Sequence, residues 1–183
     1  MLLPFGYSDG NKLAYILMRI LRLIIISILV LFTIMTIVSL FVPSRVSISR
    51  AVQINTSKEK LMEQLSNPAN WKNWYPESDS TQFYYQDGII KGLVLNKDKH
   101  HYLVITETKN DEVLATYILP NRKIVTGWKV VSAIDSTSQT VQWYMDFHLR
   151  WYPWEKFSSF VFEKIYNPQL EKGLKNLKEV LEK

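Results

Sequence analysis

The chain has 183 residues, of which 47% are hydrophobic and 13% aromatic, and it carries a formal net charge of +5. This apolar content is sufficient for one folded core and excludes a largely disordered chain. The small, scattered charge argues against a nucleic-acid partner, and the absence of cysteine excludes disulfides and thiolate metal sites.

The first element is an apolar run without charges, residues 23–42. A helix of about 20 residues spans a hydrocarbon core of about 30 Å, and a helix in a soluble core would show a polar face. A cleaved signal peptide is the alternative, but its apolar region is shorter and ends in small residues. Bulky residues and Pro43 close this run. The sequence therefore favours a short tail (1–22), an uncleaved single-pass transmembrane helix (23–42) in the lipid bilayer, and a soluble domain (43–183).

The charges on either side of the run predict its orientation in the cell membrane. Lys12, Arg19 and Arg22 precede the run, whereas Arg45 and Arg50 follow it. Basic segments tend to stay in the cytoplasm. Because the denser basic group lies before the run, we expect the soluble domain on the non-cytoplasmic side.

Two kinds of local pattern open the domain. Residues 46–54 alternate between apolar and polar side chains, which predicts a strand. Thr56 is followed three residues later by Glu59, a capping-box pattern that predicts the start of a helix. The Asn-Pro pair at 67–68 predicts a second, short helix that ends at Pro76.

Six further strands are predicted from alternating apolar segments that are separated by short turn sequences. Their ranges are 81–86, 89–96, 100–108, 112–119, 123–134 and 138–151. Such short links imply an antiparallel meander. The last strand has large apolar residues on one face and polar residues on the other, so we expect one buried and one wet face.

A long helical stretch follows Pro153. Its apolar stripe repeats at helical spacing and consists of Leu170, Leu174, Leu177 and Leu181. An apolar sheet face needs a cover, and this helix is the predicted one. Trp151, Pro153 and Trp154 are expected at the rim of the sheet, where aromatic residues could also touch a membrane interface.

Four segments of the sequence are characteristic: RAVQIN (50–55), NWKNWYP (70–76), VQW (141–143) and LEKGLKNLK (170–178). In these segments the sequence is similar to the SRPBCC superfamily, in particular to its polyketide cyclase/dehydrase-like and START-like members, and the order of elements resembles the helix-grip fold. The resemblance implies an α+β domain with a curved antiparallel sheet of about seven strands wrapped on a long C-terminal helix. It also implies an apolar cavity between them.

Catalytic chemistry is not indicated by the residues. His100 and His101 are adjacent, so on a strand their side chains point to opposite faces. His148 shares the polar face of the last strand with Asp146 and Arg150, where a solvated surface is the simpler interpretation. Motifs for zinc, phosphate loops or nucleophile elbows are absent from the sequence. We therefore predict no catalytic residue, metal or cofactor, and the interpretation leans away from an enzyme.

Aromatic residues are the candidates for contact with an apolar ligand, although the same side chains also serve to fill a core. The predicted ligand-binding residues are Trp74, Tyr102, Tyr117, Trp128, Trp143, Met145 and Phe147. The favoured function is a membrane-anchored binding module for a hydrophobic small molecule or lipid. Two alternatives remain open: a cyclase/dehydrase-type enzyme that acts on a bulky apolar substrate, and a protein-interaction domain of an envelope complex.

Overall fold

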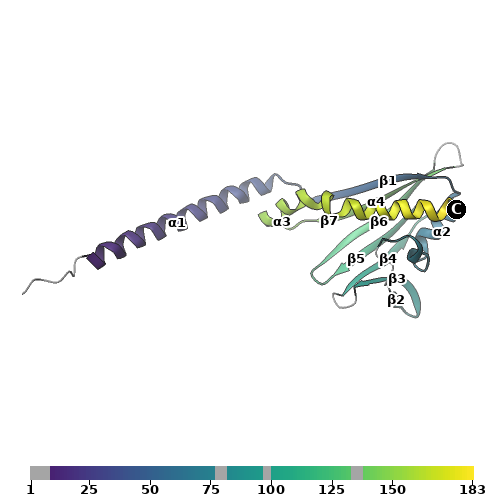
Figure 1. The fold of residues 1–183 in the computed structure, drawn as a ribbon, viewed down its shortest axis with the longest axis horizontal. Coiled ribbons are helices and arrows are strands. Elements are labelled where there is room, and N and C mark those ends of the chain that lie inside the picture. Colours follow the sequence, from purple (N-terminus) through teal and green to yellow (C-terminus); the bar gives the residue numbers. More distant parts are fainter. Residues whose placement is uncertain (1–8, 77–81, 97–99, 133–137) are drawn as a thin grey trace, which may run out of the picture.

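The computed structural model describes residues 9–76, 82–96, 100–132 and 138–183. A long apolar helix, α1 (Asp9–Leu40), extends away from an α+β domain (Figure 1). The segment Lys12–Leu40 is long and apolar enough to cross a membrane, with a mean hydropathy of 2.9, and only 6% of its most apolar part is buried. Because the domain leaves α1 exposed, α1 is not a core helix of a soluble fold.

The hydroxyl groups of α1 bond within the helix. Thr33 Oγ1 donates to the Leu29 carbonyl oxygen, and Thr36 Oγ1 donates to the Phe32 carbonyl oxygen, both at 2.8 Å. A membrane-spanning segment needs such internal partners because the bilayer core offers no water. The two threonines are therefore compatible with a lipid environment.

Anchoring by α1 can be tested by washing membranes with carbonate. We expect the full-length chain to remain in the membrane pellet, because about 20 apolar residues keep a helix in the bilayer. A chain that starts at Ser44 should instead be soluble. Release of the full-length chain, or loss of its N-terminal segment in cells, would contradict the anchor.

Seven strands form one antiparallel sheet in the order β1-β7-β6-β5-β4-β3-β2. Their bounds are β1 Arg45–Ile54, β2 Gln82–Gln86, β3 Ile89–Asn96, β4 His101–Thr108, β5 Glu112–Leu119, β6 Arg122–Ser132 and β7 Gln139–His148. The seven predicted strands are confirmed. Of the predicted strand residues, 81, 133 and 134 lie outside the described residues. The last strand, β7, ends at His148, earlier than its predicted end at Trp151.

Two short helices follow β1: α2 (Lys58–Ser66) and the 3-10 helix η1 (Asn70–Asn73). The cap of α2 is Ser57, whose side chain accepts from the Lys60 backbone N–H at 3.4 Å. The predicted cap at Thr56 is thus wrong by one residue. The Thr56 backbone N–H donates to the Ile54 carbonyl oxygen at 3.1 Å, and this hydrogen bond keeps Thr56 in the turn after β1.

The C-terminal part consists of α3 (Pro153–Ser158), a short 3-10 turn η2 (Ser159–Val161) and α4 (Phe162–Leu181), which continues through Pro168. Figure 1 shows α4 lying along the sheet, whose strands curve around it. The leucine stripe is buried at Leu170, Leu174 and Leu177. At the edge strand, Arg50 Nε lies 2.9 Å from Glu171 Oε1. The predicted cover and the helix-grip architecture are confirmed.

Candidate functional site

The space between the sheet and α4 contains a cluster of aromatic side chains, which we call the aromatic core. It consists of Trp71, Trp74, Tyr75, Trp128 and Trp143, each at most 2% exposed. Neighbouring rings have centroids 5.1 to 6.5 Å apart. Most of these pairs are tilted or edge-on, the geometry that aromatic quadrupoles favour.

The four indole N–H groups of the aromatic core differ in their partners. Trp71 Nε1 donates to the Leu65 carbonyl oxygen and Trp143 Nε1 to Thr126 Oγ1, both at 2.8 Å. Trp74 Nε1 and Trp128 Nε1 are buried and have no acceptor among the described residues. A buried donor without a partner costs about 1–3 kcal/mol. The aromatic core therefore holds two unused hydrogen-bond donors, on rings whose centroids are 5.7 Å apart.

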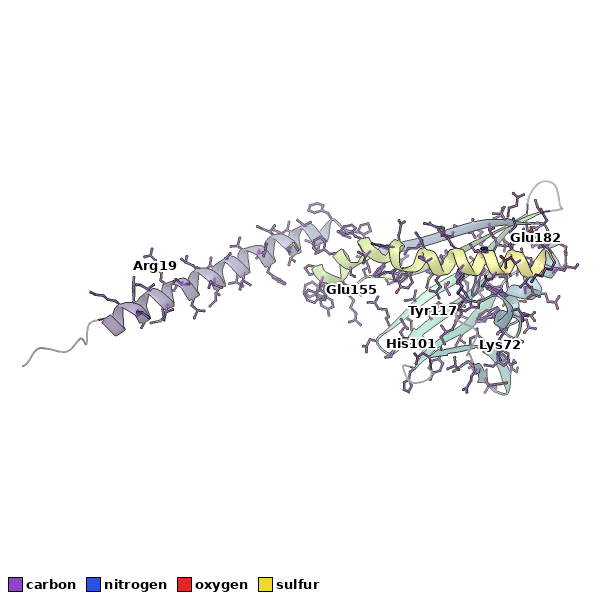
Figure 2. The ribbon with its side chains drawn as sticks, in the orientation of Figure 1. Arg19, Lys72, His101, Tyr117, Glu155 and Glu182 are labelled. Carbon is purple, nitrogen blue, oxygen red and sulfur yellow. The ribbon has the colours of Figure 1, made fainter. Side chains whose placement is uncertain are left out.

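A polar group from α4 reaches the same interior. Gln169 Nε2 donates to Tyr117 Oη at 2.8 Å and lies 3.3 Å from Tyr75 Oη. Figure 2 shows Tyr117 between α4 and the strands. Burial raises the pKa of the Tyr117 phenol further above its ordinary value, and the group is neutral at physiological pH. The interior thus offers neutral hydrogen-bonding groups beside the aromatic rings.

Six of the seven predicted ligand-binding residues lie on the inner face of the sheet or beneath α4. Trp74, Trp128 and Trp143 belong to the aromatic core, and Tyr117 adjoins it through Gln169. On β7, Met145 is buried between Trp143 and Phe147.

Phe147 and Tyr102 lie apart from the aromatic core. Phe147 packs on Phe162 and Tyr166, with ring centroids 4.7 and 4.8 Å away, and lines a pocket at the α3 end of the sheet. Tyr102 pairs in register with Ile118 on the face opposite Leu103 and packs on Tyr84, with centroids 5.4 Å apart. Its role as a ligand contact stays a prediction, and it does not join the interior group.

Sequence reasoning misses Tyr75 and Gln169. Tyr75 lies in the same NWKNWYP segment that supplies two core tryptophans, and Gln169 lies one helical turn before Gly173 on the face that packs on the sheet. Helical spacing offers a signal for Gln169. Within the described ranges, no group of three or more His, Asp and Glu side chains is placed to hold a metal ion.

The family described as polyketide cyclase/dehydrase and lipid transport matches residues 45–182. The chain belongs to this family. The match begins with β1, so α1 lies outside it. The resemblance to SRPBCC and START-like proteins is thereby confirmed. No curated protein matches the chain at a significant level.

Solved structures show the same fold at low sequence identity. A START superfamily protein from Mycobacterium smegmatis is 17% identical over 74% of this chain and 97% of its own, with a TM-score of 0.52. A point mutant of norcoclaurine synthase from Thalictrum flavum, bound to a transition-state analogue, is 12% identical over 75% and 94%, with a TM-score of 0.56. A protein from Nitrosospira multiformis is 11% identical over 74% and 96%, with a TM-score of 0.57. These similarities concern the fold alone.

Proposed function

We propose that this chain is a membrane-anchored module that binds a hydrophobic small molecule or lipid between its sheet and α4. The observation that carries the proposal is the pair of buried indole donors, Trp74 Nε1 and Trp128 Nε1, without acceptors among the described residues. A ligand with an apolar body and an acceptor oxygen would pack on the rings and satisfy these donors. The family's description, which names lipid transport, supports this ligand class.

The proposal includes the membrane. Residues 23–42 anchor the chain in the cell membrane, and the domain lies on the non-cytoplasmic side because Lys12, Arg19 and Arg22 precede the span. Alkaline phosphatase fused after Lys183 should therefore be active, and a fluorescent reporter that folds only in the cytoplasm should be dark. The reverse pattern would place the domain in the cytoplasm.

A cyclase/dehydrase-type enzyme is the second candidate, because Tyr75 and Tyr117 converge on Gln169 inside the fold. Burial raises the pKa of Tyr117, so that its phenol keeps its proton and no phenolate is available to act as a base. These groups would bind and polarise a substrate oxygen without removing a proton. Binding therefore remains the function that the geometry supports best.

The test compares two Trp→Phe substitutions in the full-length chain, with extraction and mass spectrometry of the molecules that co-purify. Trp128→Phe removes an interior donor, and we expect it to retain about two- to tenfold less ligand, since one hydrogen bond contributes about 0.5–1.5 kcal/mol. Trp151→Phe makes the same change at a side chain that is 63% exposed, and it should retain the wild-type amount. Absence of any retained molecule from the wild type, or equal losses in both variants, would contradict the proposal.

A further inference from the structure

A pocket of about 500 Å³ lies at the end of the sheet that faces α1, and we call it the membrane-proximal pocket. It is formed by the turn between β5 and β6, the end of β7, and α3. Figure 2 shows Glu155, one of its lining residues, at the end of the domain where α1 joins. Its volume is in the range of small-molecule sites, about 300–1,000 Å³.

The lining of the membrane-proximal pocket is rich in positive charge. Arg122 is paired with Glu155, with Nη2 3.1 Å from Oε1. Lys123 and Arg150 also line the pocket, and neither forms an ion pair with any described residue. Two cations without a carboxylate partner at one pocket favour an anionic ligand.

An apolar groove of about 300 Å³ adjoins this pocket, between α1 and α3. It is lined by Ile28, Leu31, Phe32, Met35, Pro153, Trp154 and Phe157. Trp154 lines both the groove and the pocket, so that the two adjoin at this side chain. A ligand that occupies both must carry an apolar part and an anionic part.

The contacts of α3 set the depth of this surface in a bilayer. Lys156 Nζ donates to the Val42 carbonyl oxygen at 2.6 Å and thereby holds α3 against the end of α1. Met35, which lines the groove, lies about 10 Å further along the helix into the membrane than Val42, at a rise of 1.5 Å per residue. This depth is greater than the thickness of the headgroup layer, about 5–7 Å. If residues 23–42 span the bilayer, the groove lies beside acyl chains and the pocket lies at headgroup level.

The aromatic residues around α3 agree with this depth. Trp151 and Phe160 are 63% and 70% exposed, and Trp154 is 62% exposed. Tryptophan is enriched where a protein meets the membrane interface. The exposed rings therefore lie where the headgroup layer would cover them.

We propose that the membrane-proximal pocket binds the anionic headgroup of a phospholipid from the surrounding leaflet, with an acyl chain of that lipid in the groove between α1 and α3. The proposal rests on the anchoring of α1 proposed above, and it concerns a different site from the aromatic core. A phosphate oxygen accepts hydrogen bonds from Lys123 and Arg150, and Trp154 packs at the level of the glycerol backbone.

The test uses the full-length chain in nanodiscs that contain equal amounts of phosphatidylcholine and phosphatidylglycerol, with native mass spectrometry of the lipids that stay bound. We expect the wild type to retain phosphatidylglycerol selectively. In the double variant Lys123→Gln/Arg150→Gln, the ratio of bound phosphatidylglycerol to bound phosphatidylcholine should fall by more than about tenfold. The reason is that each basic residue near an anionic surface raises the affinity for an anionic lipid by about fivefold. The control Lys172→Gln/Lys175→Gln changes the same charge on the exposed face of α4 and should keep the selectivity.

For a chain that enters nanodiscs, three results would overturn the proposal: equal retention of both lipids by the wild type, equal loss of selectivity in both double variants, or displacement of phosphatidylglycerol by millimolar glycerol phosphate. The last result would assign the pocket to a free soluble anion. Trp128→Phe separates the two sites, because it should lose the interior ligand and keep the lipid selectivity. A chain that fails to enter nanodiscs would overturn the anchor and this site together.

Discussion

Leu177→Ala is expected to lower the free energy of unfolding by about 2–5 kcal/mol, because it removes buried methyl groups and leaves a cavity. Leu177 is fully buried in the core between α4 and the sheet. A domain of this size is stable by about 5–15 kcal/mol, so that the change would clearly shift the midpoint of a denaturant titration. If a ligand cavity adjoins this residue, the loss falls toward the lower figure.

Lys175→Ala is the matched control on the same helix. The Lys175 side chain is exposed and its Nζ lies 4.0 Å from Glu179 Oε1. Exposed ion pairs of this kind contribute little, and surface substitutions usually change stability by less than about 0.5 kcal/mol. Equal, small effects of Leu177→Ala and Lys175→Ala would mean that α4 does not pack on the sheet.

Gly173→Ala is the second large expected effect, a destabilisation of about 1–3 kcal/mol through overpacking. Alanine is ordinarily about 1 kcal/mol better than glycine inside a helix. Here the added methyl group would overlap the Trp143 ring and lie 3.1 Å from the Pro76 ring. The Trp143 ring cannot move freely, because its Nε1 donates to Thr126 Oγ1 at 2.8 Å and other rings surround it.

A double-mutant cycle checks the cause of this effect. In a Trp143→Phe background the smaller ring should leave room for the methyl group, so Gly173→Ala should cost less than in the wild type. Denaturant titrations of the four proteins give the coupling energy. A stabilising Gly173→Ala in the wild-type background would show that α4 lies further from the sheet than the structure places it.

Much of the fold could be predicted because its signals are local. On β7 the side chains alternate with period two, and the residues on one face, from Val141 to Phe147, are buried. The leucines of α4 repeat at helical spacing, which predicts the face that covers the sheet. Turn residues between apolar segments predict the meander, and Asp87 and Gly88 adopt the positive φ angles, 52° and 76°, that a tight hairpin requires.

Other features depend on contacts that no local pattern reveals. Leu103 and Val104 are neighbours on β4 and both are apolar, so the sequence does not show which face of the strand is buried. The strand also has a register shift between Ile105 and Glu107. The face on which Tyr102 lies therefore follows only from the pairing of the strands. Thr56 and Ser57 both offer a hydroxyl, and a single backbone hydrogen bond decides which one caps α2.

The interior donors and the attachment of α3 are likewise tertiary features. Four tryptophans supply indole groups to the core, and only their packing leaves Trp74 and Trp128 without acceptors among the described residues. The bond from Lys156 to Val42 joins positions that are 114 residues apart in the sequence. The sequence offers Trp74 and Trp128 as candidate ligand contacts, and Trp151 and Trp154 as candidates for a membrane interface. It does not predict which indole donors lack an acceptor, or that Lys156 holds α3 against the end of α1.

An experimental structure of the full-length chain, purified from membranes with the molecules that accompany it, tests the central proposal most directly. We expect density for an apolar molecule between the sheet and α4, with an acceptor atom within hydrogen-bonding distance of Trp74 Nε1 or Trp128 Nε1. An interior closed by side chains alone, with neither indole donor in contact with a ligand, would contradict the binding function.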